Sequence, residues 1–321
     1  MSTQEKLLTL LLAHPTEYLS GEQLGQELGI SRTAIWKAIQ ALKAAGYHLD
    51  TKAHQGYRYQ PTDLLSAPVI RQNLATNLTD LPLNIYEQLA STNQTAKKAA
   101  AENAVTPQVF IANQQTAGYG RYGRTFVSPE QSGIYLSLLL QPTKPLTDVG
   151  LLTTAVATAV FRAIKETTGI SVDIKWVNDL YYQGKKICGI LSEAITDFES
   201  QQISHVVIGI GLNFATAATI PAELQTKVGA LFQKQPSITR NQLISALLNQ
   251  FFSLYQTYTD GTFLTEYRAH SLLIDRTVTL QQGQATITGK VKTINDAGEL
   301  VLTTSTGQQT FSSGEVTKVH F

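Results

Sequence analysis

The first 60 residues carry leucine and isoleucine at helical spacing, and these apolar positions fall into three successive helical stretches. Gly29 would end the second stretch and Ser31 would cap the third, so only a tight turn separates the two helices. Residues 47–50 and 57–59 then alternate like two short strands around a turn. This order predicts a winged helix, with its helix-turn-helix running from Gly21 to Gln40.

A second pattern, of short apolar runs interspersed with helices, follows a linker that Pro61 and Pro68 bracket. Strands are predicted at 83–87, 109–114, 133–141, 172–176, 180–183, 187–195 and 205–214. Long helices are predicted at 149–168 and 239–258, and an Ala-rich helix opens at Ser91. Helices of this kind pack on a sheet, so this part is expected to be an α+β layer domain.

The last 50 residues or so change pattern again. Five short β runs separated by turn signals are predicted at 277–281, 285–294, 300–304, 309–312 and 316–321. Such a series predicts a small barrel. The whole chain is therefore expected to be a multi-domain α+β protein, with a winged helix-turn-helix over residues 1–62, an α+β domain over 63–272 and a small β-barrel over 273–321.

Composition narrows the classes of protein that this could be. The chain has 321 residues, of which 43% are hydrophobic and 15% charged, and its formal net charge is +1, so any nucleic-acid site must be local. Its single cysteine, Cys188, excludes an internal disulfide and a cysteine-based zinc site. There is no signal-peptide pattern and no apolar run of the about 20 residues that a membrane span needs. We expect a soluble, cytoplasmic protein.

Basic charge gathers on the third helix and the wing. Between Ser31 and Tyr59 there are five basic residues and one acidic residue. The candidate DNA-binding residues are Ser31, Arg32, Thr33, Trp36, Lys37, Gln40 and Arg58. The alternative is a helix-turn-helix used only for protein contacts or domain packing. Because one copy reads a short site weakly, specific binding to operator DNA would require a dimer.

Residues 118–123 match the dinucleotide fingerprint G-x-G-x-x-G in form, but the match is expected to be accidental. The fingerprint needs a helix at its third glycine, and here Pro129 and a further strand follow. What remains is a glycine-rich loop with Arg121 and Arg124. Such a loop can bring backbone N–H and guanidinium groups onto a phosphate or a carboxylate.

Three more segments are unlike ordinary core sequence. Residues 175–179 end a strand in Asn178 and Asp179, and a hairpin then returns with Lys185 and Lys186. The segment 91–93 opens a helix, and residues 209–213 interrupt an apolar strand with glycines. Each has an ordinary structural explanation: a solvated hairpin edge, a helix N-cap and a β-bulge.

Taken in order, these segments resemble one family over nearly the whole chain: the bifunctional biotin-protein ligases that also repress the biotin operon. The resemblance implies a central sheet of the biotin/lipoate ligase type and an SH3-like terminal barrel. It implies that the chain uses biotin, ATP and Mg²⁺, with no tightly bound prosthetic group, to form biotinoyl-5′-AMP. Biotin would then pass to a lysine of the biotin carboxyl carrier protein of acetyl-CoA carboxylase.

The resemblance also implies a regulatory role. The adenylate would act as corepressor of biotin biosynthesis and transport genes: its binding orders surface loops, a homodimer forms, and two winged helices span a two-part operator. Carrier protein would compete for the same surface. In physical terms, a ligand that orders loops lowers the entropic cost of dimerisation.

The resemblance assigns roles to particular residues. Those implied to bind biotin are Ser91, Thr92, Asn93, Gln115, Gly118, Tyr119, Gly120, Arg121, Lys186, Gly189, Gly209 and Gly211. Those implied to bind the nucleotide are Arg121, Arg124, Lys186, Asn178 and Asn213, with Arg121 and Lys186 as the catalytic groups.

Two residues depart from the family pattern. Tyr119 stands where the loop usually has its first Arg, and Val177 stands where a Pro usually precedes Asn178. The loop therefore has one cation fewer and offers a ring in its place, which bears on how tightly the adenylate is retained.

The implied reaction is attack of biotin's carboxylate on the α-phosphate of ATP. Because both groups are anions, the site must neutralise their charge and align the carboxylate for attack. Arg121, Arg124 and Lys186 can neutralise charge, and Cys188, in an apolar strand, is expected to be core. Asp179 is a candidate ligand of Mg²⁺, a candidate to orient Lys186, or a turn-capping residue. Closure of the loop 116–124 would exclude water from the reactive anhydride.

Two other functions are compatible with parts of the pattern. A lipoate ligase would share the carboxylate activation, although the winged helix and the Gly-Arg loop argue against it. A biotin-sensing transcription factor with weak or lost ligase activity would agree with Tyr119. Turnover on a carrier domain separates this sensor from the ligase.

Overall fold

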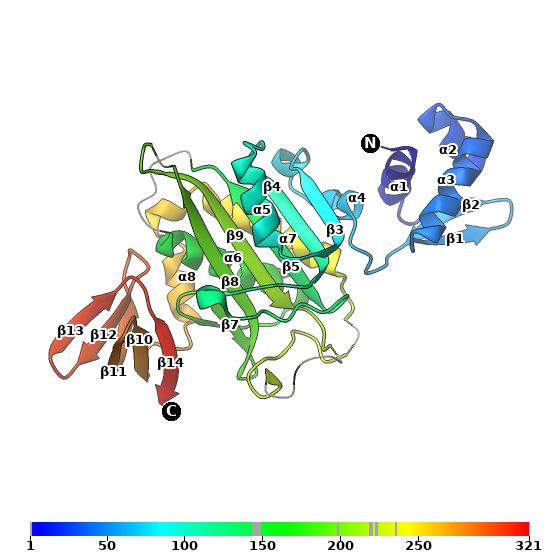
Figure 1. The fold of residues 1–321 in the computed structure, drawn as a ribbon. Helices are drawn as coiled ribbons and strands as arrows, with labels where there is room; N and C mark the ends of the chain where they lie inside the picture. Colours follow the sequence, from blue (N-terminus) through cyan, green and yellow to red (C-terminus); the bar gives the residue numbers. More distant parts are fainter. Residues whose placement is uncertain are drawn as a thin grey trace. The chain divides into compact units, whose positions relative to one another are not determined.

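The structure is a computed structural model that describes residues 2–142, 149–197, 199–217, 221, 224–234 and 236–320. The chain divides into two compact units (Figure 1). The first unit contains Met1–Thr79 and Ser237–Ser245, and the second contains Asp80–Pro236 and Ala246–Phe321. No helix in the described part of the chain is long and apolar enough to cross a bilayer.

The first unit has the predicted winged-helix order. Its helices are α1 (Thr3–Ala13), α2 (Gly21–Leu28), α3 (Arg32–Ala44) and α4 (Ala67–Gln72), with a 3₁₀ turn η1 (Thr76–Leu78), and its strands are β1 (His48–Lys52) and β2 (Gly56–Gln60). Ser31 caps α3 as expected, because its side chain accepts from the Ala34 N–H. Gly29 ends α2 in the left-handed conformation. β1 and β2 pair in antiparallel register to form the wing.

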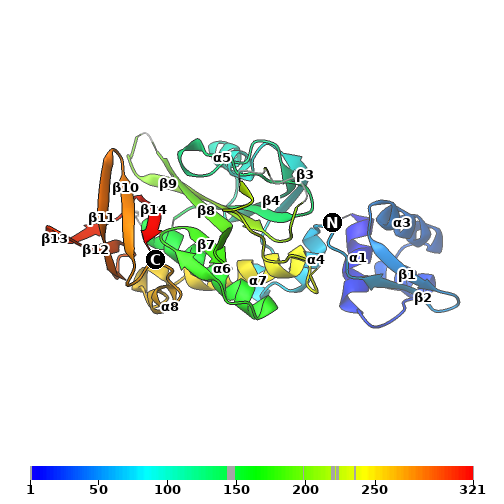
Figure 2. The same ribbon diagram turned by 90° about the horizontal axis from the view of Figure 1, so that it is seen from below.

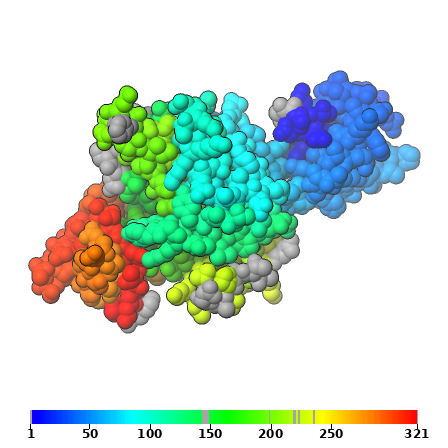
Figure 3. All heavy atoms as spheres, viewed as in Figure 1, coloured from blue at the N-terminus to red at the C-terminus, as the bar shows by residue number. Residues whose placement is uncertain are grey.

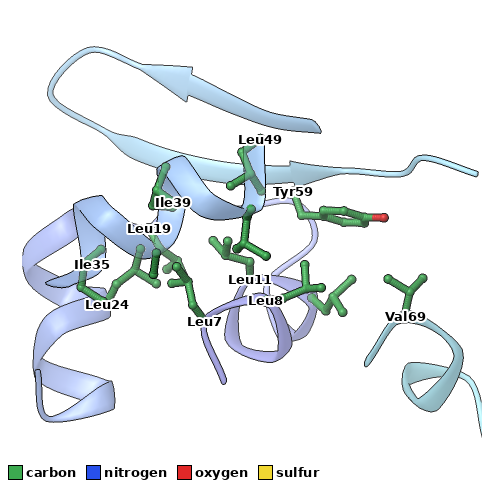
Figure 4. Close-up of a cluster of buried hydrophobic side chains, with 13 residues drawn as sticks. Leu7, Leu8, Leu11, Leu19, Leu24, Ile35, Ile39, Leu49, Tyr59 and Val69 are labelled. Carbon is green, nitrogen blue, oxygen red and sulfur yellow. The ribbon is translucent and has the colours of Figure 1, made fainter. Parts of the chain in front are cut away.

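One hydrophobic core holds the three helices and the wing together (Figure 4). The leucines of α1 point toward Ile35 and Ile39 of α3, and Leu49 and Tyr59 of the wing close the cluster from the other side. These are the apolar positions whose spacing predicts the helices.

The predicted linker is shorter than expected. Residues 61–66 lie between β2 and α4 in neither helix nor strand, so the predicted linker is confirmed over these residues. Pro68 does not belong to it, because it lies in the first turn of α4, where proline is tolerated since the N–H groups of that turn have no helical partner.

The second unit is built on a seven-stranded mixed sheet with the order β3-β4-β5-β9-β8-β7-β6. Its strands are β3 (Leu83–Leu89), β4 (Gln108–Gln115), β5 (Gly133–Leu140), β6 (Asp173–Lys175), β7 (Asp179–Tyr182), β8 (Lys185–Thr196) and β9 (Ile203–Asn213). Only the pair β3 and β4 is parallel among these ladders. The α+β prediction is confirmed, and every predicted strand of this part has its counterpart.

Helices cover both faces of this sheet (Figure 2). α5 (Thr92–Ala101) lies on one face, where its alanines pack on Phe110, Leu139 and Val207. α6 (Gly150–Thr168) lies on the other face, and its Thr153 hydroxyl bonds Ser192 of β8. The predicted helix at 239–258 is α7 (Arg240–Tyr255).

The C-terminal part is a five-stranded antiparallel sheet with the order β13-β12-β11-β10-β14. Its strands are β10 (Thr277–Gln282), β11 (Ala285–Ile294), β12 (Leu300–Thr304), β13 (Gly307–Phe311) and β14 (Glu315–His320), and α8 (Leu264–Ala269) precedes them. All five predicted strands are present, although Phe321 of the last one lies outside the described residues. Closure of this sheet into a barrel stays a prediction.

Candidate functional site

A pocket of about 260 Å³ opens on the face of the large sheet that carries α5. Its floor is formed by β8 and β9, one wall by the N-terminus of α5, and its cover by the segment that follows β4. Fifteen of the predicted site residues line it: Ser91, Thr92, Asn93, Gln115, Tyr119, Gly120, Arg121, Arg124, Asn178, Asp179, Lys186, Gly189, Gly209, Gly211 and Asn213. The structure thus brings together segments that are more than 100 residues apart.

One end of the pocket is a buried polar network. The Gln115 Oε1 atom accepts from the Thr92 N–H at 2.8 Å and from the Thr92 hydroxyl at 3.1 Å. The Gln115 amide nitrogen donates to the Ser128 Oγ at 2.9 Å. The Ser137 hydroxyl lies 2.7 Å from Thr92 Oγ1 and 2.5 Å from Asn93 Oδ1. Because each group fixes the next, this end offers preorganised donors and acceptors to a polar ligand.

Ser91 is the N-cap of α5, which is the structural alternative that its sequence position allows. Its side chain caps α5 by accepting from the Gln94 N–H, and it lines the pocket as well. The two roles are compatible because an N-cap hydroxyl retains its own proton for a further hydrogen bond.

Side chains from other elements fill the space beside the glycines of β9, where a Cβ atom would otherwise lie. A Cβ atom on Gly209 would lie 2.2 Å from Asn93 Oδ1, and one on Gly211 would lie 2.4 Å from the Phe126 ring. β5 and β9 pair without a register shift through both positions, so the alternative of a β-bulge is excluded. Gly118 does not line the pocket; its missing side chain leaves room for Gln115 and Ser128 beneath the loop.

The glycine-rich loop is a tight turn and not the start of a long helix. The Gly120 N–H donates to Arg124 O at 2.8 Å and the Phe126 N–H donates to Gly118 O at 2.9 Å, so its two arms run side by side. Residues Arg121–Gly123 form a single 3₁₀ turn, η2, and Arg124 is extended. The rejection of the dinucleotide fingerprint is therefore confirmed.

A carboxylate from the C-terminal sheet reaches this loop. Arg124 makes two hydrogen bonds to Glu315 of β14, at 2.5 and 2.7 Å. The Arg124 guanidinium holds the pKa of the Glu315 carboxyl below its usual range. In Figure 3 the green-cyan atoms of the segment after β4 meet the red atoms of the C-terminal strand. Glu315, which sequence reasoning missed, therefore belongs to the wall of the pocket.

A second cationic group lies on the floor. Lys186 Nζ is 2.6 Å from Asp179 Oδ1, and both side chains are largely buried. Burial lowers the pKa of the neighbouring Lys175 ammonium. The two predicted amides have structural partners: Asn178 Nδ2 donates to Ile190 O at 2.7 Å and Asn213 Nδ2 donates to Gly229 O at 2.9 Å. The alternative of a solvated hairpin edge holds for Lys185, which bonds Gln225 O at the surface, and not for Lys186.

Cys188 is a core residue that also borders the pocket. It is 1% exposed, and burial raises the pKa of its thiol far above the ordinary value. A thiol of this kind is a poor nucleophile. Within the described ranges, no three His, Cys, Asp or Glu side chains gather in the way that a protein-held metal site needs.

Besides Glu315, the sequence did not single out Phe126, which lines the pocket. It also did not single out four residues behind the lining: Ser128 and Ser137 bond Gln115 and Thr92, and Glu193 bonds Asn93 and Lys97. One signal was available: Ser137 is a hydroxyl in an otherwise apolar strand, where it has to find a buried partner. The other residues sit in segments whose pattern does not distinguish them.

The winged helix presents most of its predicted DNA-binding residues to solvent. Arg32, Thr33, Lys37 and Gln40 are exposed on α3, and Trp36 is 56% exposed, which is unusual for its size. Arg58 is engaged within the domain, because its guanidinium lies 4.6 Å from the Tyr18 ring centre and 3.2 Å from Asp50 Oδ2.

Comparisons with known proteins agree with this arrangement along the chain. The HTH domain family matches residues 3–58, the biotin/lipoate A/B protein ligase family matches 85–213, and the biotin protein ligase C terminal domain matches 273–319. The bifunctional ligase/repressor BirA of Bacillus subtilis is 34% identical over 98% of both chains. That of Escherichia coli is 31% identical over 92% of this chain and 91% of its own.

Solved structures agree as well. The biotin protein ligase from Aquifex aeolicus in complex with biotin and ATP is similar to 74% of this chain over 98% of its own length, with 25% sequence identity and a TM-score of 0.62. A mutant of the same ligase in complex with biotin gives 26% identity and a TM-score of 0.63. With relatives that are alike over almost their full length, the chain belongs to the family of bifunctional biotin ligase/repressor proteins of the BirA type.

Proposed function

We propose that this chain forms biotinoyl-5′-AMP from biotin and ATP, with release of pyrophosphate, and then transfers biotin to a lysine of a biotin carboxyl carrier protein, with release of AMP. The observation that carries the proposal is the pocket, whose lining combines members of the buried polar network with the cations Arg121, Arg124 and Lys186. Residues 63–272 would supply the catalytic domain, residues 1–62 the DNA-binding domain and residues 273–321 a barrel that contributes Glu315.

The polar network would bind the ureido end of biotin. Gln115 accepts two bonds from Thr92, and Ser91 keeps its own hydroxyl proton available. Such a network rejects ligands that lack matching polar atoms, because its groups would then stay buried without partners. The Phe126 ring, which lies on Gly211, would cover the apolar part of the ligand.

The cations would act where biotin's carboxylate meets the α-phosphate. Arg121 on the loop and Lys186 on the floor both line the pocket, so both can stabilise the charge that develops during attack. Asp179 holds Lys186 in place at 2.6 Å, which favours an orienting role for this carboxylate. The Lys186 ammonium would neutralise the reacting oxygens, with no covalent bond to the protein.

Mg²⁺ would enter as the complex with ATP. One carboxylate that is already paired with an ammonium is a poor protein site for a resident metal, whereas Mg²⁺ commonly takes most of its ligands from phosphate and water. In that complex the metal would offset phosphate charge. Asp179, which lines the pocket, is the candidate for one further ligand of the metal.

Transfer to the carrier lysine needs the loop as a cover. The lysine amine must arrive deprotonated at a mixed anhydride that water would otherwise hydrolyse. The turn at residues 120–124 and the contact of Arg124 with Glu315 keep this segment over the pocket.

As a repressor, the chain would act in the cytoplasm, where carboxylase and operator DNA are found. The adenylate would promote homodimerisation, and two winged helices would then bind a two-part operator. The test is the affinity for duplexes from upstream of biotin synthesis and transport genes, measured with and without biotin plus ATP. We expect much tighter binding with both ligands; equal affinity would contradict the regulatory role.

Mass spectrometry of a carrier domain incubated with this protein, biotin, ATP and Mg²⁺ tests the ligase. We expect addition of one biotin, slowed at least tenfold by Arg121→Ala because a cation at the developing charge is lost. No addition, with biotin still bound in a calorimetric titration, would overturn the ligase and support a biotin-sensing transcription factor instead.

A further inference from the structure

A relay of hydrogen bonds runs from the surface of α5 into the polar network of the pocket. It begins at Glu193 of β8, whose Oε1 lies 2.5 Å from Lys97 Nζ and whose Oε2 accepts from Asn93 Nδ2 at 2.7 Å. Asn93 Oδ1 lies 2.5 Å from the Ser137 hydroxyl, which in turn lies 2.7 Å from Thr92 Oγ1. Ser137 is fully buried, and Thr92 and Asn93 are 3% and 5% exposed, so these groups have to satisfy one another.

The direction of each bond in this relay follows from what its partners can donate. A carboxylate only accepts, so the Asn93 amide turns its nitrogen toward Glu193 and its oxygen toward Ser137. An amide oxygen also only accepts, so the single Ser137 proton goes to Asn93. The contact between the Ser137 and Thr92 oxygens then needs the Thr92 proton. The carboxylate of Glu193 thus sets the direction of the bonds that follow it.

The relay ends at Gln115, which lines the pocket. The Gln115 amide is held independently, because its Nε2 donates to Ser128 Oγ at 2.9 Å and its Oε1 accepts from the Thr92 N–H at 2.8 Å. The Thr92 hydroxyl proton is divided between Ser137 Oγ at 2.7 Å and Gln115 Oε1 at 3.1 Å, and the shorter contact takes the larger share. Gln115 Oε1 has two lone pairs, so it keeps the capacity to accept from an N–H group of a ligand.

The other two partners of Glu193 differ in what they require of it. Although burial alone would lower the pKa of Lys97, the hydrogen bond with Glu193 raises it, so the ammonium stays charged and can only donate. The Tyr119 hydroxyl, 3.0 Å from Oε2, can donate or accept and tolerates either kind of atom there. Lys97 is therefore the partner that requires an oxygen at the Oε1 position.

We propose that Lys97 and Glu193 are positioning residues that set the direction of the relay, so that Gln115 Oε1 meets the ligand as an acceptor. Neither residue lines the pocket; both act through the three buried polar groups between them and Gln115. An acceptor at this place suits a ureido group, whose N–H groups can only donate. The identity of that ligand rests on the proposed function, whereas the direction of the relay does not.

Glu193→Gln should reverse the relay without removing a bond. Lys97 requires the amide oxygen at the Oε1 position, so the new amide nitrogen faces Asn93. Asn93 then turns over to present its oxygen, and its nitrogen donates to Ser137. The two hydroxyl protons of the relay shift toward the pocket, and Gln115 Oε1 becomes occupied on both lone pairs.

The first test is the Kd of the free, full-length protein for biotin, measured by calorimetry. We expect Glu193→Gln to raise it about tenfold, the factor for one hydrogen bond, with little change in Tm. Adding Lys97→Met removes the requirement for an oxygen at Oε1, so the double variant should bind about fivefold better than Glu193→Gln alone. Adding Lys98→Met instead is the matched control and should restore nothing, because Lys98 lies on the same helix with its side chain 78% exposed.

An ion pair that only stabilised the fold would behave differently, because losing both members would weaken binding at least as much as losing one. Equal or weaker binding by the Lys97→Met, Glu193→Gln double variant would overturn the proposal. An unchanged Kd in Glu193→Gln would overturn it as well.

The second test needs no ligand. It records the nuclear Overhauser contacts of the Asn93 side-chain NH₂ protons in free protein labelled with ¹⁵N on asparagine. We expect contacts with the Glu193 side chain in wild type and with the Ser137 β protons in Glu193→Gln. Contacts that the substitution leaves unchanged would contradict the reversal. If wild type binds no biotin, the proposed function fails, while these contacts still decide the role of Glu193.

Discussion

At the scale of single residues, small side chains shape this pocket as much as large ones do. Gly209 and Gly211 leave space that Asn93 and Phe126 fill, and Gly118 does the same for Gln115. None of these three glycines has a positive φ, so they are needed for close approach and not for an unusual backbone.

Gly211→Ala should therefore weaken biotin binding. Its Cβ would come within 2.4 Å of the Phe126 ring, which would have to leave its place over the pocket. We expect the Kd for biotin, measured by calorimetry, to rise at least tenfold. Gly21→Ala is the control, because its Cβ would meet only the Arg32 Cγ at 3.9 Å. An unchanged Kd would show that the Phe126 ring can move aside without loss of biotin binding.

Cys188 should be inert in the folded protein. Its burial and the raised pKa of its thiol leave almost no thiolate at pH 8, and the thiolate is the reactive form. We expect iodoacetamide to label the urea-unfolded chain readily and the native chain hardly at all, as read by mass spectrometry. Rapid labelling of native protein would mean that this edge of the pocket opens.

At the scale of elements, the start of α7 depends on a partner that lies far away in sequence. Arg240 is 1% exposed; its Nε donates to Asp63 Oδ2 at 2.7 Å and its N–H donates to Asp63 Oδ1 at 2.7 Å. Asn241 bonds Ser66 and Leu64 nearby. The segment between the wing and α4 is thereby fixed to the first turn of a helix that the chain reaches 177 residues later.

Asp63→Ala should destabilise this unit. It leaves a buried guanidinium without its carboxylate, and we expect the free energy of unfolding to fall by about 2 kcal/mol, which is less than the about 3 to 5 kcal/mol of a fully buried pair because Asp63 is itself partly exposed. Scanning calorimetry provides the measurement. Lys290→Ala, which breaks an exposed pair with Asp275, is the control and should cost less than about 0.5 kcal/mol. Equal losses would contradict a structural role for the buried pair.

At the scale of the whole molecule, one chain combines a pocket for a small carboxylate with a DNA-binding module. The exposed face of α3 contributes Lys37, which suits phosphate contact, and Gln40, which suits a base edge. Arg58, bound to Asp50 and Tyr18, is better placed to hold the wing than to reach DNA.

Lys37→Ala and Gln40→Ala should therefore differ in their effects on operator binding. Losing Lys37 should weaken binding to all duplexes alike and lower the slope of log K against log salt by about 1. Losing Gln40 should reduce the preference for operator over unrelated duplexes and leave that slope unchanged. Fluorescence anisotropy at several salt concentrations distinguishes them; identical salt slopes for wild type and Lys37→Ala would argue against a phosphate contact.

The elements and their order follow from the amino-acid sequence alone. Helical and strand periodicity, caps such as Ser31 and the glycine-rich loop are set by contacts between near neighbours, and these predicted the winged helix and nearly every strand. The gathering of residues 91–93 with 209–211 was expected only through a family resemblance. The linker was predicted to extend to Pro68, because a proline in the first turn of a helix cannot be distinguished in sequence from one in a linker.

Only the tertiary structure decided which side chains meet. Glu193 joins Lys97 and Tyr119 because β8 lies beside β9 under α5, and Glu315 reaches Arg124 from a strand 191 residues away. Such contacts depend on strand order and on which face a side chain takes, and a one-residue change of register would reverse that face. No local pattern carries this information, so the contacts of Glu193 and the Asp63–Arg240 pair could be recognised only once the chain was folded.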